Sequence, residues 1–142
     1  MTALEHAVLR ELALNVLAKH ADPAASAPAL AAAARRAYDD VARVCTPLIG
    51  QAGVEALTGR AIHLAQREYP WLAQSREPEQ APEPFAQVML NLERQDPAAA
   101  TEAAAALLAT FTGLLVSFIG EALTARLLRK AWPDAFSEAE ET

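Results

Sequence analysis

The segment between Pro97 and Pro133 constrains the fold of this chain more than any other feature. No charged residue occurs from 103 to 120, and apolar side chains would cover nearly every side of a helix built over this range. A helix that is apolar all round has to be buried. We therefore predict a long helix that runs to about Trp132 and forms the centre of a helical bundle.

The rest of the chain predicts four more helices. Apolar residues recur every three or four positions in the first twenty residues, as in an amphipathic helix. Ser or Thr followed closely by Pro marks a helix start, because the hydroxyl can cap free backbone N–H groups and proline is tolerated in the first turn. We expect helices over about 2–20, 26–45, 46–69, 84–94 and 97–132, the last with a bend near Gly113 or Gly120.

Composition supports an all-α fold. Hydrophobic residues make up 53 % of the 142 residues, and alanine, the best helix former, supplies many of them. This length fits one domain, which we place at 1–136. The stretch 74–84 alternates proline with glutamate and predicts an exposed linker. An acidic, flexible tail is expected over 137–142.

Small residues predict where two helices pack most closely. In the last predicted helix they recur three or four positions apart, and therefore share one face. A face without bulk lets two helix backbones approach closely. A shorter small face in the third predicted helix leads to His63. The two faces consist of Ala103, Ala106, Thr110, Gly113, Ser117, Gly120 and Thr124, and of Ala52, Ala56 and Gly59.

A short internal similarity links the same two helices. The sequence EALTGR at 55–60 recurs as EALTAR at 121–126. Either the chain contains a duplicated helical unit, or an Ala- and Leu-rich sequence has matched itself by chance. A duplication would place the two helices side by side about a local two-fold axis. We then expect structural ion pairs between the copies, Glu55 with Arg126 and Glu121 with Arg60.

The net charge and the cysteine content limit the classes of partner and the cellular location that we expect. The net charge of −6 disfavours nucleic acid as a partner, because binding phosphates needs a basic face. The single cysteine, Cys45, permits no intramolecular disulfide and is expected in the core. The first residues contain charges that interrupt any apolar run, so no signal peptide is expected. The default location is the cytoplasm.

Chemical motifs are missing. None of the three histidines has a metal-ligand neighbour at helical spacing. No phosphate-binding glycine loop, C-x-x-C motif or catalytic triad is present. We predict no catalytic residues, no metal, no cofactor and no enzymatic activity.

The leading interpretation is a small cytoplasmic interaction or regulatory module that acts through protein–protein contacts, with a homodimer as one form. The alternative is a helical ligand sensor whose pocket lies between the third and fifth predicted helices. The residues expected around this pocket are His63, Phe111, Phe118 and Trp132.

A membrane helix over 103–120 is a further alternative, because this stretch is long enough to cross a bilayer. Its many Ala, Thr, Gly and Ser residues favour the core of a bundle instead.

Overall fold

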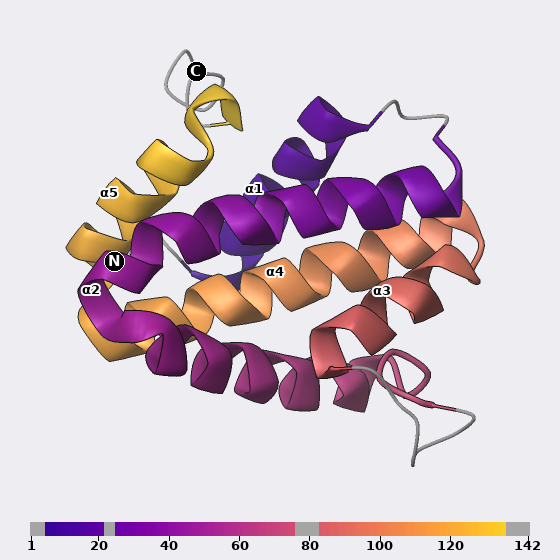
Figure 1. The fold of residues 1–142 in the computed structure, drawn as a ribbon. Coiled ribbons are helices and arrows are strands. Elements are labelled where there is room, and N and C mark those ends of the chain that lie inside the picture. Colours follow the sequence, from indigo (N-terminus) through magenta and orange to yellow (C-terminus); the bar gives the residue numbers. More distant parts are fainter. Residues whose placement is uncertain (1–4, 22–24, 76–82, 136–142) are drawn as a thin grey trace.

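In a computed structural model, which describes residues 5–21, 25–75 and 83–135, the protein is an all-α bundle (Figure 1). No β-strand occurs within these ranges, as predicted. The expected tail and residues 76–82 of the expected linker lie outside the described residues; Gln74, Glu83 and Pro84 of that linker are exposed. The helices are α1 (His6–His20), α2 (Ala27–Glu68), α3 (Pro84–Glu93), α4 (Pro97–Ile119) and α5 (Glu121–Ala131).

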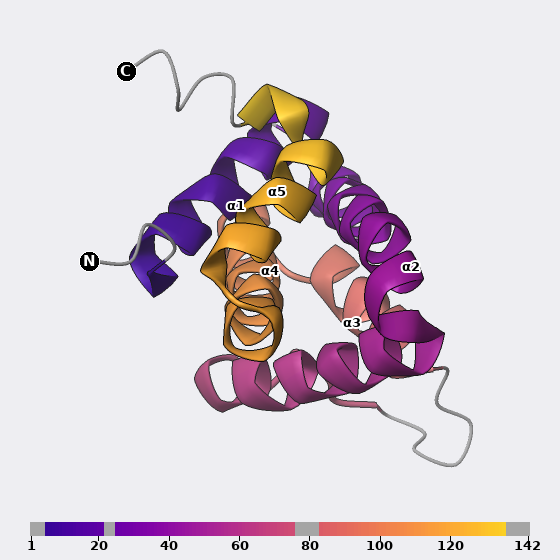
Figure 2. The same cartoon turned by 90° about the vertical axis from the view of Figure 1, so that its left-hand side faces the viewer.

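Helix α4 forms the centre of the bundle. Every residue from 103 to 109 is buried, and seven consecutive positions cover all sides of a helix. Figure 2 looks nearly along α4 and shows the other helices arranged around it. Asp96 caps the helix, since its Oδ1 accepts a hydrogen bond from the Ala99 N–H at 3.0 Å, and Pro97 occupies the first turn.

The threonine hydroxyl groups on α4 form hydrogen bonds within the helix itself. The Oγ1 atoms of Thr101, Thr110 and Thr112 donate to backbone carbonyls three or four residues earlier, at 2.7–3.1 Å. This back-bonding is a common way for threonine to enter an apolar helix. Polar atoms therefore lie in the centre of the bundle without needing partners on neighbouring helices.

Two glycine kinks redirect the chain. Gly50 has φ 82° and ψ 159°, and Gly120 has φ 93° and ψ 158°. They are the described residues with positive φ, a conformation that only glycine adopts at little cost. The first kink divides α2 into a half that runs to Ile49 and a half that begins at Gln51. The second separates α4 from α5.

The predicted helix boundary at Thr46–Pro47 is wrong. Both residues lie inside α2, and the hydroxyl of Thr46 donates to the Ala42 carbonyl at 2.6 Å instead of capping a new helix. Proline removes one helical hydrogen bond, but the chain keeps its helical direction until Gly50 supplies the positive φ. In the last predicted helix, the bend expected near Gly113 or Gly120 occurs at Gly120 as a complete break.

The two small-residue faces do not pack together as expected. On α4, Ala103 and Ala106 are buried and Gly113 lies against α1, where a Cβ would meet Leu9 Cδ1 at 3.7 Å. Ser117 and Gly120 are exposed. On α2, the predicted face of Ala52, Ala56 and Gly59 is exposed together with His63. The second half of α2 packs through the opposite side, with Val54, Thr58, Ala61, Ile62 and Ala65.

The turn after α2 is held by a buried amide. Asn91 on α3 lies with its Nδ2 at 3.0, 2.9 and 2.8 Å from the carbonyl oxygens of Trp71, Leu72 and Gln74. Gln87, one turn earlier, donates to Asn91 Oδ1 at 2.9 Å. Leu72 is fully buried. The segment after α2 therefore returns to the core, and polar side chains on α3 hold it there.

Candidate functional site

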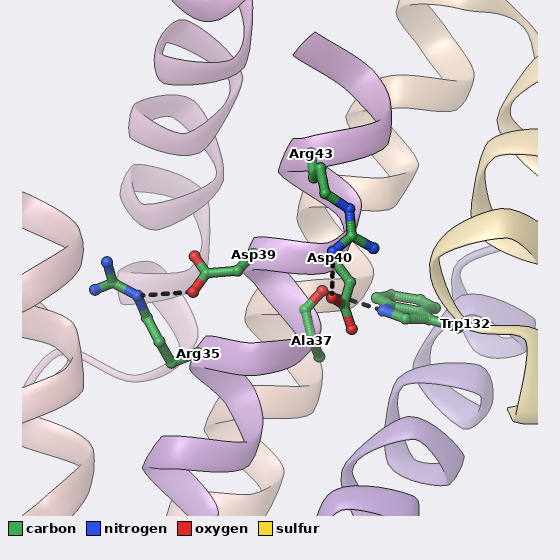
Figure 3. A network of polar contacts seen from close by, with 6 residues as sticks. All are labelled: Arg35, Ala37, Asp39, Asp40, Arg43 and Trp132. Atoms are coloured by element: carbon green, nitrogen blue, oxygen red, sulfur yellow. Dashed lines mark hydrogen bonds and ion pairs between the residues drawn. The ribbon is translucent and has the colours of Figure 1, made fainter.

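The predicted ligand pocket is not formed. His63 is exposed on the second half of α2, and Phe118 at the end of α4 is 63 % exposed. Phe111 is buried against Tyr38, with ring centroids 5.6 Å apart. Trp132 is buried as well, but its indole Nε1–H donates to the Ala37 carbonyl at 3.1 Å (Figure 3). The kink at Gly120 carries Trp132 toward the first half of α2, away from His63.

The predicted crosswise ion pairs are not formed either. Arg60 and Arg126 are exposed, and neither belongs to an ion pair among the described residues. Glu55 instead accepts a hydrogen bond from Gln51 within the same helix, at 3.2 Å. The second half of α2 and helix α5 lie on opposite sides of α4 (Figure 2). The predicted contact about a two-fold axis, and with it a Glu121–Arg60 pair, is therefore absent.

The two EALT segments nevertheless share a pattern of burial. Thr58 and Thr124 are both buried, and each hydroxyl donates to the carbonyl four residues earlier at 2.7 Å. Ala65 and Ala131, related by the same offset, are buried too. Both segments therefore turn the same side toward the core. Whether they arose by duplication stays a prediction.

The two kinks lie at the same end of the molecule, on the left in Figure 1 and facing the viewer in Figure 2. We call residues 46–52 and 114–120 the kinked end. No charge occurs in either stretch. Leu48 and Phe118 each stand two positions before a kink glycine and are 50 % and 63 % exposed. The two stretches of the kinked end therefore present uncharged side chains, among them two large exposed apolar ones, to their surroundings.

A hollow of about 430 Å³ lies beside Tyr38, between α2 and the start of α3. The Tyr38 ring stacks on Phe85 at 4.1 Å. Its hydroxyl is 2.5 Å from Thr58 Oγ1, and because Thr58 donates to the Val54 carbonyl, Tyr38 is the donor in this pair. Burial raises the pKa of the Tyr38 hydroxyl above its ordinary value. Tyr38 therefore keeps its proton at neutral pH.

Nucleophilic and metal chemistry find little support in the described residues. No group of three His, Cys, Asp or Glu residues there is arranged to hold a metal ion. Cys45 is buried, and burial raises the pKa of its thiol to about 11. The thiolate, which is the reactive form, is therefore scarce at neutral pH.

One described helix, Pro97–Ile119, is long and apolar enough to cross a membrane, and 56 % of its most apolar window is buried inside the bundle. Length and composition do not separate the core helix of a bundle from a membrane span. Comparison of the chain with protein-family models, with curated proteins and with solved structures gives no match.

Proposed function

We propose that this protein is a small helical interaction module that acts through protein–protein contacts, and that its kinked end binds a second copy of the chain. The observation that carries the proposal is the exposure of Phe118, which is 63 %, within stretches of sequence that contain no charged residue. Contiguous exposed apolar surface is typical of interaction sites. Aromatic side chains are enriched in the centre of interfaces, where charged residues are depleted.

Charge supports a second copy as the partner. The chain carries a net charge of −6, so most approaches of two copies bring like charges together. The kinked end is the part of the described surface where two uncharged stretches, 44–54 and 103–120, meet. An isologous dimer brings the same patch of both copies together, and an uncharged patch can do so without repulsion.

Size-exclusion chromatography with light scattering tests the proposal. We expect the wild-type chain to form a dimer, and Phe118→Asp and Leu48→Asp to be monomeric, because each variant would bury an unpaired carboxylate in the interface. Leu90→Asp is the matched control, since Leu90 is 39 % exposed on α3, away from the kinked end (Figure 1). Circular dichroism checks that all variants fold.

A wild-type chain that stays monomeric up to the highest concentration measured would contradict the proposal. A control variant that becomes monomeric to the same degree would also contradict it, because the interface would then not be the kinked end.

Small-molecule binding is a second candidate function, supported by the hollow beside Tyr38. Its volume of about 430 Å³ is within the range of small-molecule sites, roughly 300–1,000 Å³. Native mass spectrometry of protein purified from its host tests for a retained ligand. Gly59 lines the hollow with open space at its Cβ position, so Gly59→Leu should remove a bound mass. A mass that persists in this variant argues against this site.

Our proposal also places the protein in the cytoplasm and assigns it no enzymatic activity. The burial of much of α4 supports a core helix over a membrane helix. Cell fractionation tests the placement: we expect the protein in the supernatant, whereas release from the pellet by detergent alone would make the kinked end a lipid-binding surface.

A further inference from the structure

A second hollow, of about 340 Å³, lies at the opposite end of α5 from the kink, between α1, α2 and α5. It differs from the rest of this acidic chain because its lining is rich in cations. Asp40 and Asp134 are its carboxylates. Four cationic side chains, as well as His20, line it from three helices, namely Lys19, Arg36, Arg43 and Lys130.

The two carboxylates of the described lining do not balance its cations. Asp40 Oδ1 lies 3.5 Å from Arg43 Nη1 (Figure 3), so this pair is already formed. Neither Arg36 nor Lys130 makes an ion pair with another described residue. Among the described residues, four cationic side chains and two carboxylates line the hollow, so this part of its lining carries more positive than negative charge in a chain of net charge −6.

Helix dipoles account for only part of this pattern. Lys19 is in the last turn of α1 and Lys130 is in the last turn of α5, where cations stabilise the negative end of a helix. Arg36 and Arg43 lie within the first half of α2, far from either end. Their spacing of seven residues, about two turns, places both on the side of α2 that faces the hollow.

The wall of the hollow is fixed by long-range packing. Trp132 is 3 % exposed, and its indole N–H donates to the Ala37 carbonyl of α2 at 3.1 Å (Figure 3). Val16 and Ala135, which also line the hollow, are buried. A wall that is already rigid loses little conformational entropy when a ligand binds.

We propose that this hollow binds a small anion that carries two or more negative charges, of the phosphate or carboxylate class. Arg36 would supply a planar guanidinium that can bind two oxygens at once, and Lys130 an ammonium from the facing helix. The volume suits a compact multivalent anion. This site is separate from the kinked end, and neither proposed function includes it.

Isothermal titration calorimetry with two probes, inorganic pyrophosphate and tricarballylate, tests the proposal. We expect at least one probe to bind the wild-type chain at one site, more weakly at higher ionic strength because the charges are exposed to solvent. The double variant Arg36→Gln/Lys130→Gln should lose about tenfold or more in affinity, since charge-assisted hydrogen bonds to the anion are removed. Comparison of the probes separates phosphate from carboxylate.

The matched control is Arg60→Gln/Arg126→Gln, which removes two exposed arginines outside the hollow and changes the net charge equally. This control should bind as the wild type does. The proposal is overturned if neither probe binds, if Arg36→Gln/Lys130→Gln retains the wild-type affinity, or if the control loses as much affinity as that variant. Phe118→Asp should bind the probe normally, which keeps this test independent of dimerisation.

Discussion

The pKa values of two core residues, Cys45 and Tyr38, are shifted mainly by burial and not by a neighbouring charge. Cys45 lies in the core with no exposed surface, and burial raises the pKa of its thiol from 9.0 to about 11. Tyr38 shows the same direction of shift for the same reason. Both groups are neutral when protonated, so the core favours the protonated form of each.

The raised pKa of Cys45 predicts that stability falls as the pH rises from about 9 to about 11. In this window the unfolded chain releases the thiol proton while the folded chain keeps it, so a higher pH favours unfolding, by at most about 1.4 kcal/mol per pH unit. Urea unfolding at a series of pH values measures the effect. Tyr38 contributes a further loss at the alkaline end of this range.

Cys45→Ala separates the two contributions. The variant should be less stable at neutral pH because a small cavity is left, but its stability should change less between pH 9 and 11. If wild type and variant had parallel pH profiles, Cys45 would not be the source of the effect.

At the scale of helices, glycine conformation decides the path of the chain. Gly50 and Gly120 have nearly the same backbone angles and stand in the similar sequences Ile-Gly-Gln-Ala and Ile-Gly-Glu-Ala. A Cβ added at either position would meet no atom within 4 Å. Any cost of adding one is therefore a cost of backbone conformation alone.

Alanine substitutions test this conclusion with opposite expected signs. Gly50→Ala and Gly120→Ala should each destabilise the fold by about 1–2 kcal/mol, because a residue with a Cβ is strained at positive φ. Gly59→Ala should stabilise it by about 0.5–1 kcal/mol, since Gly59 is helical with open space around it. Denaturant midpoints measure all three, and a stabilising effect at Gly50 or Gly120 would refute the role given to the kinks.

Local chemistry explains which elements could be predicted from the sequence. Ser26 and Asp96 cap helices that begin close to the predicted starts at 26 and 97, because capping needs only the side chain and the next few N–H groups. Thr46–Pro47 carries a similar signal and fails, because nothing there makes the preceding chain leave the helix. The positive φ at Gly50 depends on how both halves of α2 pack against the rest of the bundle. This packing cannot be predicted from the sequence around Gly50 alone.

The candidate site was less predictable because it, too, depends on how distant segments pack. Helical periodicity can place residues on a common face, but the direction of each helix after a kink decides which faces meet. The predicted pocket combined Phe118 and Trp132. The break at Gly120 separates them: Phe118 is exposed at the end of α4, whereas Trp132 is buried against α2. The basic hollow could not be seen in the sequence, because Arg36 and Lys130 are 94 positions apart.

At the scale of the whole molecule, a few polar contacts join distant parts of the chain. The Trp132–Ala37 hydrogen bond spans 95 residues. Arg10 on α1 donates to the Tyr69 hydroxyl at 3.2 Å and lies 3.7 Å from Glu68, at the end of α2. These contacts fix the outer helices around α4 and supplement the apolar core.

The Trp132 contact predicts a long-range loss of stability. Trp132→Phe should cost about 1–2 kcal/mol, because it removes the hydrogen bond and leaves part of the buried volume unfilled. Trp71→Phe should cost less, since Trp71 is only half-buried. Thermal and urea unfolding of both variants provide the comparison, and an equal loss in the two would show that the indole N–H contributes nothing specific.

The self-bonded threonines of α4 have a mechanical consequence. Each of these hydroxyls bonds within its own helix, so a small rotation or axial slip of α4 would break none of those bonds. The fit of surfaces, such as Leu9 against Gly113, resists such a movement. A shift of the whole helix α4 should therefore accommodate larger or smaller side chains packed around it. The protein should tolerate such substitutions in its core better than substitutions at Gly50 and Gly120.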